Sequence, residues 1–258
     1  MTPPPAPKRA DLPAPLVRDF RSLLEQALEA TDAEGRKWSD AKWGCYAFYD
    51  YDGEPIYVGQ TNEQLRTRVR RHLTNQRTDA VAMRILDVFE VAEMELWPLW
   101  EFEGANAKDK DTRSRLDAVE YSAYVQAICE SRFHAILNEK IPPRSALVDL
   151  PPSRRFELAS AETRRERGHP DIRIARRAET LSRLTAVAHE RGVVSPGLRR
   201  VIVVQAVRLA HLAASRLAYA EGRPEPSAGA IDIKGLVGTL FQEHSEQADP
   251  DDGDSDLD

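Results

Sequence analysis

Gly44-Cys45-Tyr46 and Tyr57-Val58-Gly59, separated by ten residues, predict the β-hairpin on which the fold is built. Asp52-Gly53 lies between apolar runs in that gap, which is a strong signal for a two-residue hairpin loop. With that loop, Tyr46 faces Gly59 and Phe48 faces Tyr57. Because side chains alternate between the faces of a strand, Tyr46 and Tyr57 share one face as diagonal neighbours, about 7–8 Å apart. Gly59 leaves space beside both phenols.

An arginine-rich helix is expected directly after the hairpin. Thr61-Asn62-Glu63-Gln64 fits a capping box with Thr61 as the N-cap. Arg68 and His72 are four residues apart, so both side chains project in the same direction. Two phenols beside a gap, followed by an arginine and a histidine, indicate a site that handles phosphate.

Glu120 is predicted to be a buried carboxylate. It recurs at four-residue steps with Leu116, Tyr124 and Ile128, so it lies within the apolar stripe of a helix over residues 114–131. Burying an unpaired carboxylate is costly, and such a group usually has a cation or a metal ion as its partner. A salt bridge to one of the arginines is the alternative. A single carboxylate with water ligands suits Mg²⁺, or Mn²⁺ in its place.

These motifs resemble the GIY-YIG endonuclease family, in which Gly-Ile-Tyr is followed after about ten residues by Tyr-Ile-Gly. The resemblance covers residues 40–143, and Cys45 replaces the middle aliphatic residue of the first motif. Arg68 and His72 match the family's helix residues, and Glu120 matches its metal-binding glutamate. Asn138, in Ile136-Leu137-Asn138, matches a late asparagine, although the gap from Glu120 is longer than is usual in the family.

The resemblance implies metal-dependent hydrolysis of DNA phosphodiester bonds. Tyr46 would activate the attacking water and Tyr57 would position it, while Arg68 would hold the scissile phosphate. His72 would relay a proton or bind a phosphate. The expected catalytic residues are Tyr46, Tyr57, Arg68, His72, Glu120 and Asn138, with Glu120 as the metal ligand. Backbone phosphates of DNA are expected to be contacted by Arg66, Arg70 and Arg71.

The charge distribution is compatible with DNA as the partner. The net charge is −6, but eight acidic residues and no Lys or Arg follow Phe241. Without those eight, 34 of the 42 acidic residues remain against 36 basic ones, so the body of the protein is slightly positive. The acidic end should be disordered, either as a solubilising tail or as a mimic of DNA that restrains non-specific binding.

The order of elements predicts an α/β (α+β) fold with a small antiparallel three-stranded sheet flanked by helices, plus a C-terminal helical domain. The third strand is expected around Met94, Leu96, Trp100 and Phe102. Helices are expected over 13–31, 80–90, 114–131, 173–191, 197–221 and 231–242, with a loop at 103–113. The expected organisation is a disordered arm at 1–11, a nuclease-like domain with an N-terminal helix at 12–143, an Arg-rich linker at 144–172, a helical domain at 173–242 and a disordered acidic tail at 243–258.

Location and biological role follow from weaker signals. No apolar run reaches about 18 residues and no signal-peptide core is visible, so no membrane association is expected. Cys45 and Cys129 should be buried thiols in a reducing cytoplasm. The helical domain would serve packing or homodimer formation, or recruitment to a partner; residues 185–206 resemble a helix-turn-helix only weakly.

The chain shows neither a helix-hairpin-helix pair nor a second nuclease domain, which an excision-repair subunit would carry. A restriction or phage-defence enzyme is therefore expected. The alternatives are a non-catalytic nucleic-acid-binding module that retains the nuclease fold, and a nuclease recruited to a larger repair or defence complex through its helical domain.

Overall fold

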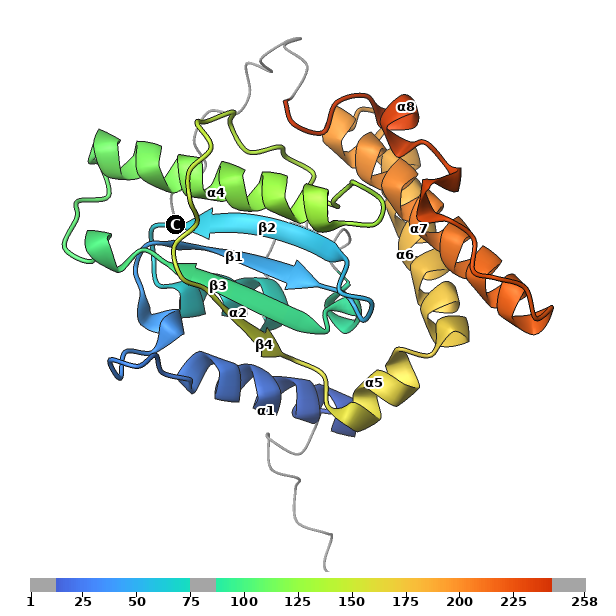
Figure 1. Ribbon diagram of the computed structural model, residues 1–258, viewed down its shortest axis with the longest axis horizontal. Helices are drawn as coiled ribbons and strands as arrows, with labels where there is room; N and C mark the ends of the chain where they lie inside the picture. Colours follow the sequence, from blue (N-terminus) through green and yellow to red (C-terminus); the bar gives the residue numbers. More distant parts are fainter. Residues whose placement is uncertain (1–12, 75–86, 243–258) are drawn as a thin grey trace, which may run out of the picture.

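A four-stranded antiparallel sheet forms the centre of the protein, in a computed structural model that describes residues 13–74 and 87–242 (Figure 1). The strands are β1 (Gly44–Tyr49), β2 (Pro55–Thr61), β3 (Glu93–Pro98) and β4 (Arg154–Glu157), in the order β2-β1-β3-β4. The expected arm at 1–11, most of the expected helix over 80–90, and the acidic tail at 243–258 lie outside the described residues. The part of 80–90 that is described forms a short 3₁₀ turn, η3 (Val88–Glu90).

The prediction of three strands was wrong, because the segment expected to be a linker supplies a fourth. β4 pairs with β3 from Glu93↔Glu157 to Leu96↔Arg154. In β4 only Phe156 is buried, and its three neighbours in the strand are exposed. A strand with a single apolar residue has no detectable alternation, which is why its sequence resembles a charged linker.

The register of the β1–β2 hairpin was predicted correctly, but its loop was not. Tyr46 pairs with Gly59 and Phe48 with Tyr57, whereas Tyr49 pairs with Pro55. The loop has three residues rather than two, because Asp50 N–H donates to the Glu54 carbonyl at 2.9 Å and Gly53 adopts φ +76°. A β-bulge between the Phe48 and Tyr49 pairs compensates for the extra loop residue.

Two helices pack on the hairpin from different sides. α2 (Leu65–Thr74) lies against the face that carries Tyr46, and α4 (Lys110–Glu130) packs on β2 and β1. The capping box was wrong: Thr61 ends β2 and its Oγ1 accepts from Glu63 N–H at 3.1 Å, so α2 begins four residues later. α4 begins earlier than expected, because Asp109 serves as its N-cap.

The remaining elements near the sheet are short or peripheral. α1 (Pro15–Glu29) packs against η2 (Trp38–Asp40) and lies beside α2. The expected third strand ends at Pro98, and Trp100–Phe102 forms the 3₁₀ turn η4 instead. Cys45 is buried as expected, but Cys129 is exposed near the end of α4, contrary to expectation.

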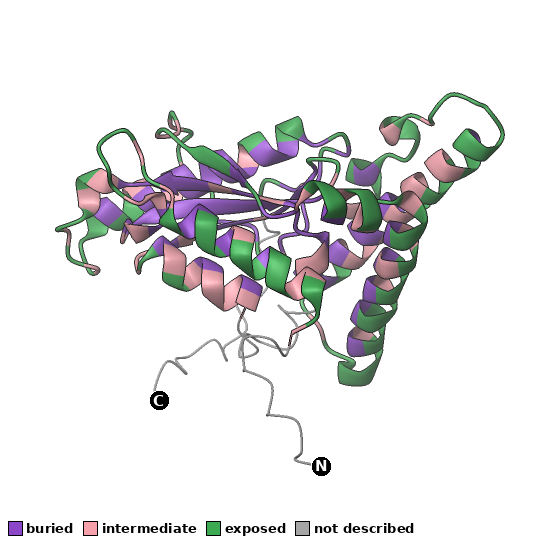
Figure 2. Ribbon diagram, turned by 90° about the horizontal axis from the view of Figure 1, so that it is seen from below, coloured by how far each residue is buried: buried purple, intermediate pink, exposed green. Residues whose placement is uncertain are grey.

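The C-terminal part of the chain forms a helix pair that packs against the sheet domain. After α5 (Ala161–Arg167) come α6 (Pro170–Arg191) and α7 (Pro196–Ala220), which pack closely on each other, and then the single-turn α8 (Ile233–Val237). The two long helices match the expected 173–191 and 197–221, and Ser195 caps α7 as predicted. Figure 2 shows that β1, β2 and β3 are largely buried, while exposed residues follow the outer sides of the helices. β4 is mostly exposed. The homodimer expected through these helices remains a prediction.

α7 also qualifies, among the described helices, as long and apolar enough to span a membrane, with a mean hydropathy of 1.4 over 18 residues. No membrane-spanning segment was expected from the sequence. Core helices of soluble proteins pass the same criterion, and a third of this window is buried. The buried Arg208 in the middle of α7 contacts backbone carbonyls of the sheet domain, which ties this helix to the rest of the protein.

A chain cut after residue 143 should not form a stable domain. The cut removes β4 with the buried Phe156, the buried Leu158, and the arginines that bind the β1–β2 loop. We expect circular dichroism to show no cooperative thermal transition, whereas residues 13–242 should melt like the full chain. A cooperative transition of 13–143 within a few degrees of the full chain would contradict this.

Candidate active site

Tyr46 and Tyr57 lie side by side on one face of the hairpin, as their register predicts. Their ring centroids are 6.0 Å apart with planes inclined by 30°. Gly59 makes this arrangement possible, since a Cβ at that position would lie 2.7 Å from both Tyr46 Oη and Tyr57 Cε1. Such contacts are far inside van der Waals distance, so glycine is the only residue that fits opposite Tyr46.

Arg68 and His72 of α2 both reach the hydroxyl of Tyr46. His72 Nε2 lies 2.8 Å from Tyr46 Oη, and Arg68 Nε donates to the same oxygen at 3.4 Å. The two side chains project in the same direction, as their four-residue spacing predicted, and the structure shows that both reach one phenol. Tyr46 itself is fully buried.

The protonation states of this cluster follow from burial. Desolvation, reinforced by the neighbouring Tyr57, raises the pKa of Tyr46 well above its usual value, and Arg68 only partly opposes the effect. Desolvation together with the positive charge of Arg68 lowers the pKa of His72 to about 4. At neutral pH Tyr46 is therefore a phenol and His72 a neutral imidazole within reach of the phenolic proton.

Arg68 differs from the other three arginines of α2. Arg66 donates to Glu29 at 2.7 Å, Arg70 to Glu25 at 2.5 Å, and Arg71 to Glu63 at 2.9 Å. Arg66 also binds the carbonyl of Leu28, so its guanidinium is held within the protein rather than presented to solvent. Arg68, by contrast, has no carboxylate within ion-pair distance in the described parts of the chain, and its positive charge is free for an anion.

Glu120 approaches the site from α4. It is buried, and desolvation together with Asp117 one turn earlier raises its pKa to about 7, while Arg68 and Gln60 oppose the rise. Gln60 Nε2 donates to Asp117 Oδ1 at 2.8 Å, which links the end of β2 to this carboxylate pair. Asp117 and Gln60 were not expected from the sequence, although their positions, three residues before Glu120 and directly after Gly59, could have indicated them.

The donor atoms around Glu120 suit a hard divalent ion. Among the described residues no group of three or more His, Cys, Asp or Glu side chains is placed to hold a metal. Two carboxylates on one helix, with water completing the shell, are nevertheless typical of Mg²⁺ sites in proteins. A cation there would also relieve the energetic cost of burying the Glu120 charge.

The side chain of Asn138 is hydrogen-bonded to β2, the strand at the edge of the sheet. Its amide accepts from Val58 N–H at 2.9 Å and donates to the Val58 carbonyl at 2.7 Å. Val58 lies between Tyr57 and Gly59 on β2, the strand at the edge of the sheet. Asn138 therefore holds the strand that carries Tyr57, and its catalytic role stays a prediction.

Residues 42–102, which include the hairpin, α2 and β3, match the family model of the GIY-YIG catalytic domain. This match implies a nuclease fold for that segment. Glu120 and Asn138 lie beyond the matched residues. No curated protein and no solved structure matches the chain.

Replacing Gly59 by alanine should disrupt the site more than the fold. The added methyl group would force Tyr46 and Tyr57 apart, and a displacement of about 1 Å near reacting groups can lower a rate about a hundredfold. Gly104→Ala is the matched control, because nothing lies within 4 Å of a Cβ at that position. Nuclease activity, which the match to the family model implies, and thermal melting should be measured together. Equal activity of the two variants would contradict the packing described here.

Proposed function

We propose that this protein is a metal-dependent endonuclease that hydrolyses DNA phosphodiester bonds. The observation that carries the proposal is the free charge of Arg68, which lies against the Tyr46 hydroxyl while each neighbouring arginine of α2 is neutralised. A planar guanidinium without a carboxylate partner matches a phosphate, with which it can form two parallel hydrogen bonds.

The geometry supports the following division of roles. Arg68 holds the scissile phosphate and stabilises the negative charge that develops on it. Tyr46 takes a proton from the attacking water as its own hydroxyl proton passes to His72 Nε2, over the 2.8 Å contact. Because burial raises the pKa of Tyr46, a free phenolate does not form, and the two proton transfers have to occur together. Tyr57 orients the water through its place beside Tyr46.

Glu120 is the residue that would hold Mg²⁺ or Mn²⁺, with Asp117 beside it. When bound, the ion supplies positive charge for the pentavalent phosphate and the leaving oxygen. Gln60 keeps the two carboxylates in place by donating to Asp117, and hydrogen bonds from Gln60 also favour the ionised form of Glu120.

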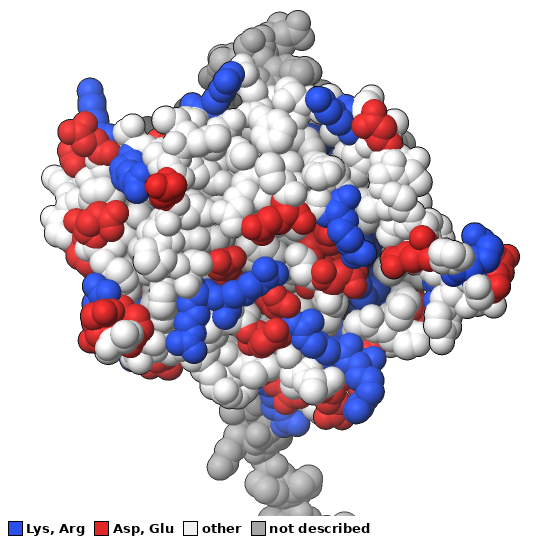
Figure 3. Space-filling model, in the orientation of Figure 1, with Lys and Arg blue, Asp and Glu red and all other residues white. Residues whose placement is uncertain are grey.

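The distribution of charge on the face that carries β4 supports this assignment. Figure 3 shows basic and acidic side chains interspersed on the face that carries β4. Several of them neutralise each other, as in the pairs Arg155–Glu93 and Arg164–Glu157. We therefore place the DNA at the tyrosine site and not on the β4 face.

The biological role we propose is restriction or phage defence. No helix-hairpin-helix pair is evident in the described residues, and α6 and α7 pack on the nuclease domain instead. The alternative of a non-catalytic binding module is disfavoured by Glu120, because a binding protein gains nothing from a carboxylate buried beside its phosphate-binding arginine.

Substitutions at Tyr46 and Arg68 should separate catalysis from folding. Tyr46→Phe and Arg68→Ala should each lower the single-turnover cleavage rate about 10²–10³-fold, since each removes a group that acts in the transition state. Arg183→Ala, in an exposed ion pair on α6, is the control and should cleave normally. The assay uses supercoiled, linear, branched and modified DNA with Mg²⁺. Normal cleavage by the Tyr46→Phe variant would show that Tyr46 is not the base, and the role would then be assigned to Tyr57.

The Mg²⁺ concentration that is needed for cleavage should depend on pH, because Glu120 titrates near neutral pH. Below about pH 7 its carboxyl binds a proton that the ion has to displace, so the half-saturating Mg²⁺ concentration should fall about tenfold per pH unit up to pH 7 and then level off. His72, with a pKa of about 4, does not titrate in this range. Glu120→Gln should abolish cleavage at every pH and remove the rise in melting temperature caused by Mg²⁺. Full cleavage in excess EDTA would refute metal dependence.

A further inference from the structure

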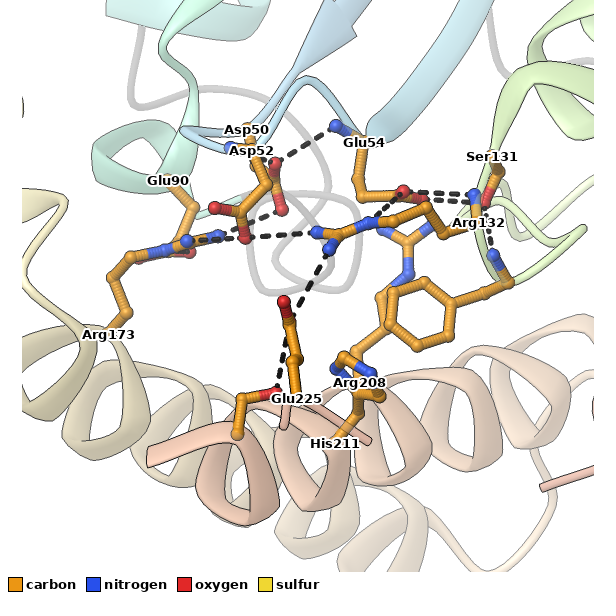
Figure 4. A network of polar contacts seen from close by, with 12 residues as sticks. Asp50, Asp52, Glu54, Glu90, Ser131, Arg132, Arg173, Arg208, His211 and Glu225 are labelled. Atoms are coloured by element: carbon orange, nitrogen blue, oxygen red, sulfur yellow. Dashed lines mark hydrogen bonds and ion pairs between the residues drawn. The ribbon is translucent and has the colours of Figure 1, made fainter. Parts of the chain in front are cut away.

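The loop of the catalytic hairpin is held by buried ion pairs with the C-terminal helices. The two carboxylate oxygens of Asp50, the residue directly after β1, bind different partners. Oδ1 accepts from the N–H groups of Asp52 at 2.8 Å and Glu54 at 3.0 Å, which shapes the loop. Oδ2 accepts from Arg173 at 3.0 Å (Figure 4). It also accepts from Arg177 at 2.5 Å, and both arginines lie on α6.

This carboxylate is charged although it is almost fully buried. Burial alone would raise the pKa of Asp50, but Arg177 and Arg173 outweigh the effect and hold the pKa below its usual value. Arg173 also binds Asp52 at 2.6 Å, and Arg177 binds Glu90 at 3.3 Å. The loop is thus fixed by ionic contacts from which water is largely excluded.

A second arginine contact fixes the beginning of β2. Arg208 of α7 donates to the carbonyls of Pro55 at 3.1 Å and Ala135 at 2.8 Å. It lies 3.7 Å from Glu54, whose carboxylate also accepts from Ser131 at 2.6 Å (Figure 4). Burial lowers the pKa of Arg208 to about 10, so its charge is retained at neutral pH.

These contacts continue along the outer edge of β2 as far as Val58. Arg208 binds the Pro55 carbonyl, Leu137 N–H donates to the Ile56 carbonyl at 3.2 Å, and Asn138 binds both backbone groups of Val58. An edge strand would otherwise have these groups unpaired. The strand that carries Tyr57 is therefore paired with β1 along one edge, and on its other edge the residues before and after Tyr57 are hydrogen-bonded to Leu137 and Asn138.

Little space is available for water molecules that could replace these ionic contacts. A cavity of about 20 Å³ lies between the loop and the helix pair, lined among others by Asp50, Arg177 and Arg208. A space of that size holds about one water molecule. Loss of an ionic contact would leave a buried charge without a full set of partners, and the loop would have to move to reach water.

We propose that Arg173, Arg177 and Arg208 are positioning residues: from outside the matched segment, they fix the β1–β2 hairpin and thereby the two tyrosines. The helix pair is then part of the framework of the active site rather than an independent module. The consequence for catalysis rests on the proposed nuclease function, whereas the effect on hairpin geometry does not.

The test uses the full chain with Asp50→Asn and Arg173→Lys. The asparagine keeps the shape and the loop hydrogen bonds but loses the charge, and the lysine keeps the charge but cannot reach two acceptors with a planar fork. Leu184→Ala is the matched control: Leu184 is buried on the same face of α6, two turns beyond Arg177, and its truncation loosens the helix pair without removing a contact to the loop.

Hydrogen exchange of the amides of residues 46–58, followed by mass spectrometry, reports on the hairpin independently of activity. Both hairpin variants should exchange these amides at least about tenfold faster, as expected from loss of charged hydrogen bonds. Leu184→Ala should leave them within about twofold of the wild type, even where it lowers the melting temperature more. Single-turnover cleavage should fall about 10–100-fold in the hairpin variants at unchanged affinity for DNA.

The outcomes are distinct. Hairpin exchange that is unchanged, or that rises equally in Leu184→Ala, would overturn the positioning role and leave only general stabilisation. Faster hairpin exchange without any DNA cleavage by the wild-type protein would refute the proposed nuclease function while the positioning of the tyrosines stands. If Asp50→Asn does not fold, Arg173→Lys alone decides the question.

Discussion

The carboxylate of Asp50 is the interaction on which the arrangement of this protein depends. One of its oxygens closes the loop between the two strands of the active-site hairpin, and the other binds two arginines of α6. Burying an ionised carboxylate is tolerated only when good partners surround it, and their removal is strongly destabilising. The local conformation of the hairpin and the docking of the helix pair are therefore fixed by one side chain.

Charged side chains near one end of the hairpin are paired with opposite charges, and those near the other end are not. At the loop end, buried acids and arginines are matched, and every charge has a partner of opposite sign. At the tyrosine end, Arg68 and Glu120 lie near each other without forming an ion pair, and the pKa of Glu120 is raised by burial. The first arrangement gives rigidity, and the second leaves charged groups unpaired, as the proposed binding of phosphate and a cation requires.

The sequence predicted the register of the hairpin and the common direction of Arg68 and His72 correctly, because both depend on local spacing. The pairing of Tyr46 with Gly59 and the common direction of Arg68 and His72 follow from strand and helix periodicity. β4 could not be predicted, because only Phe156 in it is buried. The ion pairs of Asp50 could not be predicted either: Arg173 and Arg177 look like the solvated arginines around them, and only the tertiary structure brings them to a loop more than 120 residues earlier.

The buried contact of Arg208 also sets the time at which the active site can be completed during synthesis. Arg208 follows Pro55 by 153 residues, which corresponds to about 8 to 30 s of translation at 5–20 residues per second. Throughout that interval the tyrosine hairpin is already made but lacks the partner that fixes its second strand. The contact between Arg208 and Pro55 is thus a long-range one, and the hairpin cannot reach its final geometry on the ribosome until the chain has emerged past Arg208.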